Sequence, residues 1–372
     1  MRAAETAQSW RTLPLGEVST LQRGYDLPVQ DRTPGTVPIF AANGPVGLHS
    51  VAQCDGPGVI TGRSGTIGKV HYVNVPYWPL NTSLYVKDFH GNHPRFIYWL
   101  LSCLHLERFH EGSGVPTLNR NIVHAVNVSV PSLEEQRRIA DMLDRAAALR
   151  AKRRAAIAYL DELTQAIFID MFGDPASNPK GWPEDVLGSV AAFVGGGTPS
   201  RARPEYFTGR ICWATSKDMK HEFLDDTEEH ITEQAIEECA TKLVPAATIL
   251  VVVKSKILAH HLPVAVARVP TCFGQDLKGI IPTERCNGFF IATALRLGKR
   301  WLLERARGIN TEGLTLEHLR AFPLLMPPLA LQDEFARRGA TVDRLKSSHR
   351  TALSQLDSLF ASLQDRAFRG AL

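Results

Sequence analysis

Residues 118–143 read LNRNIVHAVNVSVPSLEEQRRIADML, and residues 314–339 read LTLEHLRAFPLLMPPLALQDEFARRG. Aligning Gln136 with Gln332 gives an offset of 332 − 136 = 196 residues. This single offset aligns identical residues without a gap from Ala125 to Phe172, which predicts an internal repeat. The identical pairs are Ala125 and Ala321, Pro131 and Pro327, Leu133 and Leu329, Ala140 and Ala336, Leu149 and Leu345, Leu160 and Leu356, Leu163 and Leu359, and Phe172 and Phe368.

A second similarity precedes each of these stretches. Trp10 stands six residues before Gly16, and Trp182 stands six residues before Gly188, an offset of 182 − 10 = 172. The difference, 196 − 172 = 24, places extra residues in the second copy. The chain therefore alternates a variable segment with a helical segment, twice. The predicted ranges are 1–131 and 182–327 for the variable segments, 132–172 and 328–372 for the helical segments, and 173–181 for a linker rich in Pro and Gly.

The first helical segment has the start signal and the spacing of a long helix. Ser132 can cap its N-terminus, with Glu135 three residues on as in a capping box. No Gly or Pro interrupts residues 132–172, so the helix would extend about 60 Å at 1.5 Å per residue. Apolar residues recur at steps of three and four, as in a coiled-coil seam. The positions predicted to pair the helices or to dock a partner are Gln136, Ile139, Leu143, Leu149, Leu160, Leu163, Gln332, Leu345, Leu356, Leu359 and Leu363.

The second helical segment repeats this pattern, although we expect Gly339 to weaken its start. Two long helices with narrow apolar seams can bury those seams by packing on each other. A whole domain separates the helices along the chain, so the pairing would be antiparallel. The alternative is that each helix packs on its own domain or on a partner.

Both variable segments contain short β-branched stretches between Gly and Pro turns, which is typical of a twisted, mostly antiparallel sheet with short helices. Examples are residues 37–40, 58–61, 248–253 and 264–267. The predicted fold class is α+β: two α+β domains separated by a long antiparallel two-helix coiled coil, in a pseudo-twofold tandem repeat.

Composition narrows the class of protein. Of 372 residues, 44% are hydrophobic and 22% charged, as in globular proteins, and the net charge of +4 permits nucleic-acid binding without requiring it. Six cysteines lie singly, with no Cys-x-x-Cys pair, so we expect reduced thiols and no structural zinc. The N-terminus lacks the apolar core of a secretory signal, and no apolar run reaches ~20 residues. We expect a cytoplasmic protein without membrane contact.

Residues 62–69, GRSGTIGK, form the first candidate binding loop. They are not a nucleotide-binding P-loop, because Arg63 stands where the first Gly belongs and Val70 replaces the Ser or Thr that binds the metal. Such a turn can bring backbone amides and the cations of Arg63 and Lys69 onto a DNA phosphate or base edge. A purely structural hairpin is the alternative.

The second variable segment has a cationic stretch in the corresponding region, where residues 254–261 read KSKILAHH. Adjacent histidines rarely bind one metal ion, so the stretch is a candidate nucleic-acid contact, and we expect no metal site. The chain also lacks the Asn-Pro-Pro-Phe/Tyr run of an adenine N6-methyltransferase, a G-x-G-x-x-G loop and a helicase nucleotide site. Asp218-Met219-Lys220 has nuclease-like spacing without an acidic partner. We expect no catalytic centre.

Taken together, these features resemble the specificity subunit of type I restriction-modification enzymes over nearly the whole chain. The most specific marks are PSLEEQRRIA from Pro131, PPLALQ from Pro327 and LFASLQDRAFRG from Leu359. GRSGTIG from Gly62 and NTS from Asn81 are also similar, and residues 273–276 take the place of the second motif in the other variable segment. The second copy departs from the first, with Leu331 and Asp333 where Glu135 and Arg137 stand, which implies unequal partner contacts.

The resemblance implies that each variable segment reads one half of a split target in double-stranded DNA, and that the paired helices set the spacer. It also implies docking of two methyltransferase subunits, which carry S-adenosylmethionine, and it allows two translocase-nuclease subunits. This chain itself would hold no cofactor. The candidate DNA contacts are Arg63, Ser64, Thr66, Lys69, Asn81, Lys254, Ser255, Lys256, His260, His261, Gln275 and Lys278.

Two other functions stay open on the sequence alone. The chain could be a protein-interaction scaffold without DNA readout, in which the coiled coil only dimerises. It could also be a hydrolase that uses Cys, His and Asp residues of the second variable segment. The sequence also leaves open whether the parent complex restricts DNA or only methylates it.

Overall fold

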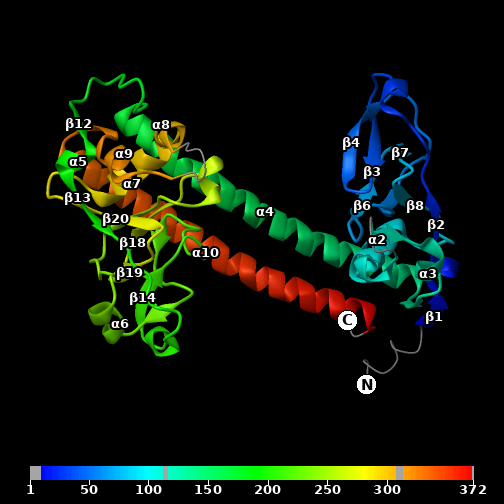
Figure 1. Ribbon diagram of the computed structural model, residues 1–372. Coiled ribbons are helices and arrows are strands. Elements are labelled where there is room, and N and C mark those ends of the chain that lie inside the picture. Colours follow the sequence, from blue (N-terminus) through cyan, green and yellow to red (C-terminus); the bar gives the residue numbers. More distant parts are fainter. Residues whose placement is uncertain (1–9, 112–115, 307–312, 371–372) are drawn as a thin grey trace. The chain divides into compact units, whose positions relative to one another are not determined.

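The computed structural model describes residues 10–111, 116–306 and 313–370 (Figure 1). The chain forms two compact units. Unit 1 contains residues 1–155 and 350–372, and unit 2 contains residues 156–349. Each unit therefore holds one sheet-containing domain together with a part of each long helix. No helix of the described residues is long and apolar enough to cross a membrane.

The domain of unit 1 contains a four-stranded sheet, a three-stranded sheet and two two-stranded sheets. In the larger sheet the strand order is β2-β8-β5-β6, and all pairs are antiparallel. The central strand β5 is buried along its whole length, which explains its apolar, β-branched sequence. The strands and helices are β1 (Arg11–Pro14), α1 (Leu15–Val18), β2 (Thr20–Arg23), η2 (Val29–Asp31), β3 (Val37–Ala41), β4 (Gly44–His49), β5 (Gly58–Gly62), β6 (Val70–Val73), β7 (Trp78–Pro79), β8 (Ser83–Asp88), α2 (Pro94–Cys103), η3 (Leu106–Phe109), β9 (His110–Glu111), β10 (Thr117–Leu118), α3 (Arg120–His124) and β11 (Asn127–Val130).

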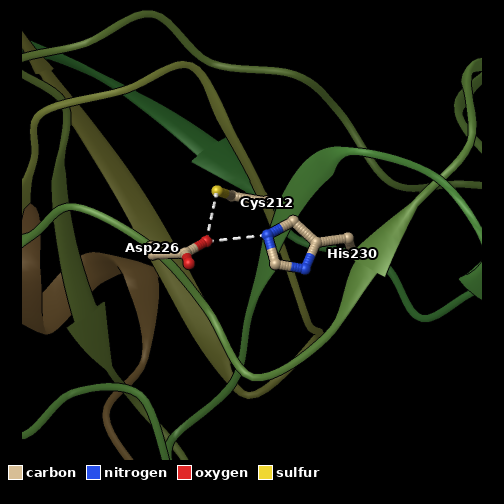
Figure 2. A group of neighbouring side chains, drawn as sticks. All are labelled: Cys212, Asp226 and His230. Carbon is tan, nitrogen blue, oxygen red and sulfur yellow. Dashed lines mark hydrogen bonds and ion pairs between the residues drawn. The ribbon is translucent and has the colours of Figure 1, made fainter.

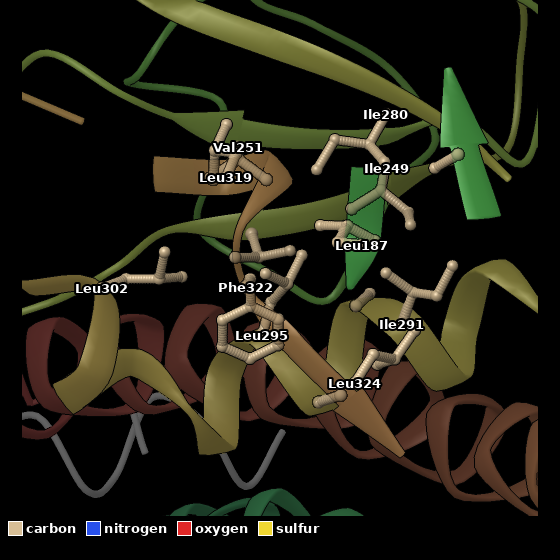
Figure 3. Packing of buried hydrophobic residues seen from close by; sticks show 14 of the residues in the cluster. Leu187, Ile249, Val251, Ile280, Ile291, Leu295, Leu302, Leu319, Phe322 and Leu324 are labelled. Atoms are coloured by element: carbon tan, nitrogen blue, oxygen red, sulfur yellow. The ribbon is translucent and has the colours of Figure 1, made fainter. Parts of the chain in front are cut away.

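The domain of unit 2 has a five-stranded sheet in the order β13-β20-β17-β18-β15 and a three-stranded sheet, β16-β14-β19. Its core lies between the larger sheet, α7 and the long helices, and includes Ile249, Ile291 and Phe322 (Figure 3). The elements are β12 (Glu184–Val186), α5 (Leu187–Val190), β13 (Ala191–Gly195), η4 (Pro204–Phe207), β14 (Ile211–Ala214), β15 (Phe223–Leu224), β16 (His230–Ile231), α6 (Glu233–Glu238), β17 (Ile249–Val252), η5 (Lys256–Ala259), β18 (Val264–Ala267), β19 (Thr271–Phe273), β20 (Leu277–Pro282), α7 (Gly288–Leu297), α8 (Lys299–Arg305), α9 (Leu316–Arg320) and β21 (Pro323–Leu325).

The two long helices are α4 (Leu133–Phe172) and α10 (Leu329–Phe368), each of 40 residues. They fall within the ranges predicted from the heptad spacing. The Ser132 hydroxyl accepts the Glu135 N–H at 3.4 Å, but the Glu135 carboxylate pairs with Arg138 instead of completing the capping box. Gly173, with φ +82°, follows the end of α4, where a left-handed residue commonly ends a helix.

Gly339 has a different role from the one expected. It lies inside an unbroken α10, and a Cβ on this residue would lie 2.1 Å from Cε1 of Phe289. The Phe289 ring stacks on Phe335 with centroids 5.2 Å apart. The glycine is therefore required by the close approach of α7 rather than by flexibility of the helix.

An ion pair between α4 and α10 occurs twice. In unit 1, Arg150 Nε lies 2.5 Å from Asp357 Oδ1. In unit 2, Lys346 Nζ lies 3.1 Å from Asp161 Oδ1. The offset of 196 relates the partners, because 150 + 196 = 346 and 161 + 196 = 357. The repeat seen in the sequence is thus a repeat of contacts between the two helices inside each unit.

An aromatic contact is repeated in the same way. Phe96 of α2 meets Phe368 at the end of α10, with ring centroids 5.6 Å apart. Phe290 of α7 meets Phe172 at the end of α4, with centroids 4.9 Å apart. Each domain therefore packs against the C-terminal end of the long helix from the other copy.

Buried glutamines fix each domain to the start of the long helix that follows it. Gln136, 2% exposed, accepts the His93 N–H through Oε1 at 2.8 Å and donates to the Pro131 carbonyl at 3.1 Å. Gln332, fully buried, makes the equivalent pair of bonds in unit 2. Both side chains were predicted to pair the helices or dock a partner, and the structure shows their amides engaged inside the chain.

His124 makes stability depend on pH. Its Nε2 accepts the Leu21 N–H at 2.8 Å, so the ring must be neutral, and burial, followed by the charge of Arg120, lowers its pKa. The depressed pKa means that the stabilisation is complete above pH ~6.5 and is lost as the pH falls through the folded-state value. We expect the unfolding free energy to drop between pH 7.5 and 5.5.

Urea denaturation at the two pH values checks this expectation. A His124→Phe variant should lose about 1 kcal/mol at pH 7.5, the worth of one hydrogen bond, and should depend less on pH. Some dependence should persist, because burial also lowers the pKa of His71, His93 and His261. An unchanged pH dependence in the variant would exclude His124 as a contributor.

Candidate nucleic-acid interface

The loop at residues 62–69 is held rigidly at the end of β5. A Cβ on Gly62 would lie 1.7 Å from the Thr66 carbonyl oxygen, so only glycine permits this turn. Gly65 and Gly68 have φ values of +87° and +91°, in the left-handed region that favours glycine. The glycines of the motif therefore fold the loop back tightly on itself, a geometry that fits both the DNA-contact turn and the structural hairpin that the sequence left open.

Three of the candidate contacts in unit 1 come together at this loop. The N–H groups of Arg63 and Ser64 both donate to the Thr82 carbonyl, at 2.9 and 3.2 Å. Arg63 Nη1 also donates to the Asn81 carbonyl at 3.3 Å, and the Asn81 amide binds the carboxylate of Asp26. Arg63, Ser64 and Asn81 are thus one structural group, although 18 residues separate the first from the last.

The remaining candidates in this unit lie around the same loop. Thr66 contributes its carbonyl to the turn over Gly62. Lys69 is exposed, and its carbonyl accepts the Thr61 hydroxyl at 2.9 Å. The exposed Lys69 side chain therefore adds a cation at the C-terminal end of the loop.

Unit 2 repeats this backbone arrangement with other side chains. The N–H groups of Val253 and Lys254 both donate to the Asp276 carbonyl, at 2.8 and 3.3 Å. The segment at residues 273–276 therefore occupies the place of the Asn81 segment, as predicted. Gln275 is exposed beside this carbonyl, at the position equivalent to Asn81.

The cationic stretch of unit 2 is only partly suited to binding an anion. Lys254, Lys256, His260 and His261 are exposed. Ser255 instead caps η5 by accepting the Ile257 N–H at 3.4 Å. Partial burial and the charges of Lys299 and Arg296 lower the pKa of His261, which disfavours a positive charge on its ring.

The comparisons with known proteins agree with this architecture. Residues 8–158 and 179–357 match the family described as "Type I restriction modification DNA specificity domain". The two matched ranges cover most of the chain and correspond to its two copies. The chain belongs to this family.

Two relatives are type I specificity subunits. The chain is 43% identical over 99 residues to the "Type I restriction enzyme EcoR124I/EcoR124II specificity subunit" of Escherichia coli, over 26% of this chain and 24% of that one. It is 33% identical over 109 residues to the MjaIX specificity subunit of Methanocaldococcus jannaschii, over 28% of this chain and 24% of that one. The matched stretches thus span about a quarter of each relative.

Solved structures share the fold across the whole chain. A type I restriction-modification S subunit from M. genitalium has a TM-score of 0.68 and 14% identity, with 96% of both chains covered. A structure described as "Structural basis underlying complex assembly and conformational transition of the type I R-M system" has a TM-score of 0.55 and 18% identity, with 98% of both chains covered. At these identities the likeness shows the fold alone.

One cluster bears on whether this specificity-domain protein could be a hydrolase. Cys212, Asp226 and His230 meet in unit 2 (Figure 2). The carboxylate lies in the middle, with Oδ1 at 3.6 Å from Cys212 Sγ and 2.7 Å from His230 Nε2. A Cys-His-Asp triad needs the imidazole between the other two groups. Burial raises the pKa of the Cys212 thiol, and the carboxylate adds to this, so the cysteine is not an activated nucleophile.

The same three ligand atoms lie within 4.8 Å of one another, a proximity that the sequence did not reveal because β14 and β16 place Cys212 opposite His230. Asp226 and His230 already form a short hydrogen bond with each other, so each has a hydrogen-bond partner without a metal ion. The nuclease-like Asp218 is likewise engaged, since its carboxylate accepts the N–H groups of Thr215 and Glu228 at 2.8 and 2.9 Å.

The long helices of this specificity-domain protein expose some of the leucines predicted for docking. In unit 1, Leu149 and Leu359 are 53% and 63% exposed, and in unit 2, Leu345 and Leu163 are 49% and 40% exposed. The offset of 196 relates Leu149 to Leu345 and Leu163 to Leu359. Each unit therefore presents one equivalent pair of exposed leucines. The other predicted positions are buried (Ile139, Leu143) or half-buried (Leu160, Leu356, Leu363).

Proposed function

We propose that this chain is the non-catalytic DNA specificity subunit of a type I restriction-modification complex in the cytoplasm. Each sheet-containing domain reads one half of a bipartite target in double-stranded DNA. The helices α4 and α10 form an antiparallel coiled coil that sets the spacer between the halves. A rigid spacer raises the effective concentration of the second domain at its half-site and makes the spacing part of the specificity.

The observation that carries this proposal is the repetition of contacts between the long helices. The pair of Arg150 with Asp357 recurs as Lys346 with Asp161. Such a pseudo-twofold repeat presents two equivalent surfaces, which suits binding of two copies of one partner. We assign these surfaces to two methyltransferase subunits, which carry S-adenosylmethionine and transfer its methyl group to adenine. Two translocase-nuclease subunits would complete a complex that also restricts DNA.

Nearly all of the affinity of a protein for DNA phosphates comes from Lys and Arg, while sequence is read by side chains held against the base edges. The exposed cations of the two loops, Lys69 and Lys254, supply the first kind of contact. In the first domain, the glycine turn at residues 62–69 supplies the fixed geometry that the second kind needs. The two loops begin with the same pair of backbone hydrogen bonds and carry different side chains, as expected for two domains that read different half-sites.

Methyl transfer in a reconstituted mixture tests the proposal. The purified methyltransferase with labelled S-adenosylmethionine should methylate duplex DNA only when this chain is added. Binding of that complex to DNA should weaken steeply as salt rises, because phosphate contacts release counterions. A protein-interaction scaffold would leave methylation independent of the chain and its binding almost insensitive to salt.

A further inference from the structure

Three arginines converge on one cavity at the end of the larger sheet in unit 1. The cavity has a volume of about 370 Å³, and Arg23, Arg63 and Arg120 line it. They come from the end of β2, the turn after β5 and the start of α3. Asn119 and Asn121 add polar groups to the wall. Of these five residues, only Arg63 was predicted from the sequence to contact DNA.

The positive charge of this cavity is poorly compensated by the chain. Asp26 Oδ1 lies 3.7 Å from Arg23 Nη2, but both side chains are largely exposed, where such a pair contributes little. Within the described residues, no ion pair is formed by Arg63 or Arg120. Each guanidinium carries five donors and no acceptor. The cavity therefore suits a ligand with several hydrogen-bond acceptors and negative charge.

Unit 2 does not repeat the arginines. The positions equivalent to Arg23 and Arg63 are Gly195, from 23 + 172 = 195, and Val253, from the matching hydrogen bonds to Thr82 and Asp276. Arg120 corresponds to Leu316, because 120 + 196 = 316. Contacts that hold the fold together, such as the buried glutamines, are kept in both copies. Residues that differ between the two copies at equivalent backbone positions, such as these arginines, are the ones expected to give the two domains different ligands.

Lysines stand near the equivalent place in unit 2. Lys278 Nζ lies 3.7 Å from the Cβ position of Gly195, and Lys254 follows Val253 directly. An ammonium is a point charge, whereas the planar guanidinium fork can bind two acceptors at once. The two domains thus present cations at corresponding sites, but only the arginines of the first domain can select a ligand by the geometry of two paired acceptors.

We infer that the arginine cavity is the DNA contact site of the first domain, and that its guanidinium groups bind paired acceptor atoms of the DNA. This inference rests on the proposed function and deepens it. The acceptors are either O6 and N7 of a guanine in the first half-site or the oxygens of a backbone phosphate. Both sources offer the same chemistry, a pair of acceptors matched to the fork, and they differ in what a substitution does to the sequence that is read.

The test compares Arg23→Ala, Arg63→Ala, Arg63→Lys and Arg120→Ala in the complex with the methyltransferase. Lys87→Ala, which removes an exposed charge at the other end of β8, is the matched control. Genome-wide mapping of methyladenine gives the target, and titrations at several salt concentrations give DNA affinity. Thermal unfolding checks that each variant is folded.

We expect the alanine variants to lose about 10- to 100-fold in affinity while the second half-site and the gap stay as they are. If the ligand is guanine, the first half-site relaxes at one position, and Arg63→Lys relaxes it too. If the ligand is phosphate, the motif is kept, the salt slope falls by about one per residue, and Arg63→Lys is nearly silent. Affinity, salt slope and motif all equal to wild type, or equal losses in Lys87→Ala, would overturn the inference. A wild-type complex without any split motif would count against the proposed function instead.

Discussion

Under the proposed function, a chain that carries Leu149→Asp and Leu359→Asp is expected to bind one methyltransferase subunit, and the wild-type chain is expected to bind two. Both leucines are more than half exposed, and they lie on the two long helices of unit 1. Burying a leucine at an interface contributes about 1.5–3 kcal/mol, so losing two weakens binding at least about 100-fold. The substituted carboxylates add a desolvation penalty. The equivalent pair in unit 2, Leu163 and Leu345, should keep its partner.

Sedimentation velocity or native mass spectrometry of the purified complex measures this stoichiometry. The double substitution Leu163→Asp and Leu345→Asp should also remove one partner, and all four together should remove both. Val29→Asp, at an apolar residue of unit 1 that is 73% exposed and lies outside the long helices, is the control and should keep two. A four-fold variant that is folded and still binds two methyltransferase subunits would show that docking uses another surface.

The second large effect concerns the buried glutamines. We expect Gln136→Leu to lower the unfolding free energy by about 3 kcal/mol, because the His93 N–H and the Pro131 carbonyl lose their buried partner and each such loss costs about 1–3 kcal/mol. Gln332→Leu should have a similar effect, since Asn287 N–H and the Pro327 carbonyl depend on it at 2.9 Å each.

Urea denaturation of each variant measures the loss. Gln165→Leu, at an exposed position of α4, makes the same chemical change on the surface and should stay within about 0.5 kcal/mol of wild type. A loss in Gln136→Leu no larger than in this control would mean that the glutamine contributes little to holding the domain on its helix.

The features that the sequence predicted are those carried by local periodicity or by a fixed offset. The ranges of α4 and α10 follow from an uninterrupted heptad pattern, which lies in one stretch of chain. The offset of 196 also relates the ion pair of Arg150 with Asp357 to the ion pair of Lys346 with Asp161, although neither pair could be read from the sequence before the helices were known to pack. In a tandem repeat, a long-range contact found in one copy predicts the equivalent contact in the other copy.

The features that the sequence missed depend on chain segments meeting in space. Gln136 and Gln332 follow the seam pattern closely enough to be taken for docking residues. Each one instead accepts a hydrogen bond from a backbone N–H group more than 40 residues earlier in the chain. Gly339 looked like a weak point because Phe289, which fills the space beside it, is 50 residues distant. Arg23 belongs to no motif, and nothing in the repeated stretch at residues 118–143 marks Arg120 as a binding residue, since only the folded chain brings β2 and α3 to the turn that carries Arg63.

The central claim is that this chain directs methylation to a split DNA sequence. The most direct test is to express it with its methyltransferase in a host without DNA methylation and to map N6-methyladenine across the genome by single-molecule sequencing. We predict a motif of two short half-sites with a fixed gap, present with the chain and absent without it. Methylation that stays the same when the chain is omitted, or that follows a single continuous motif, would contradict the account.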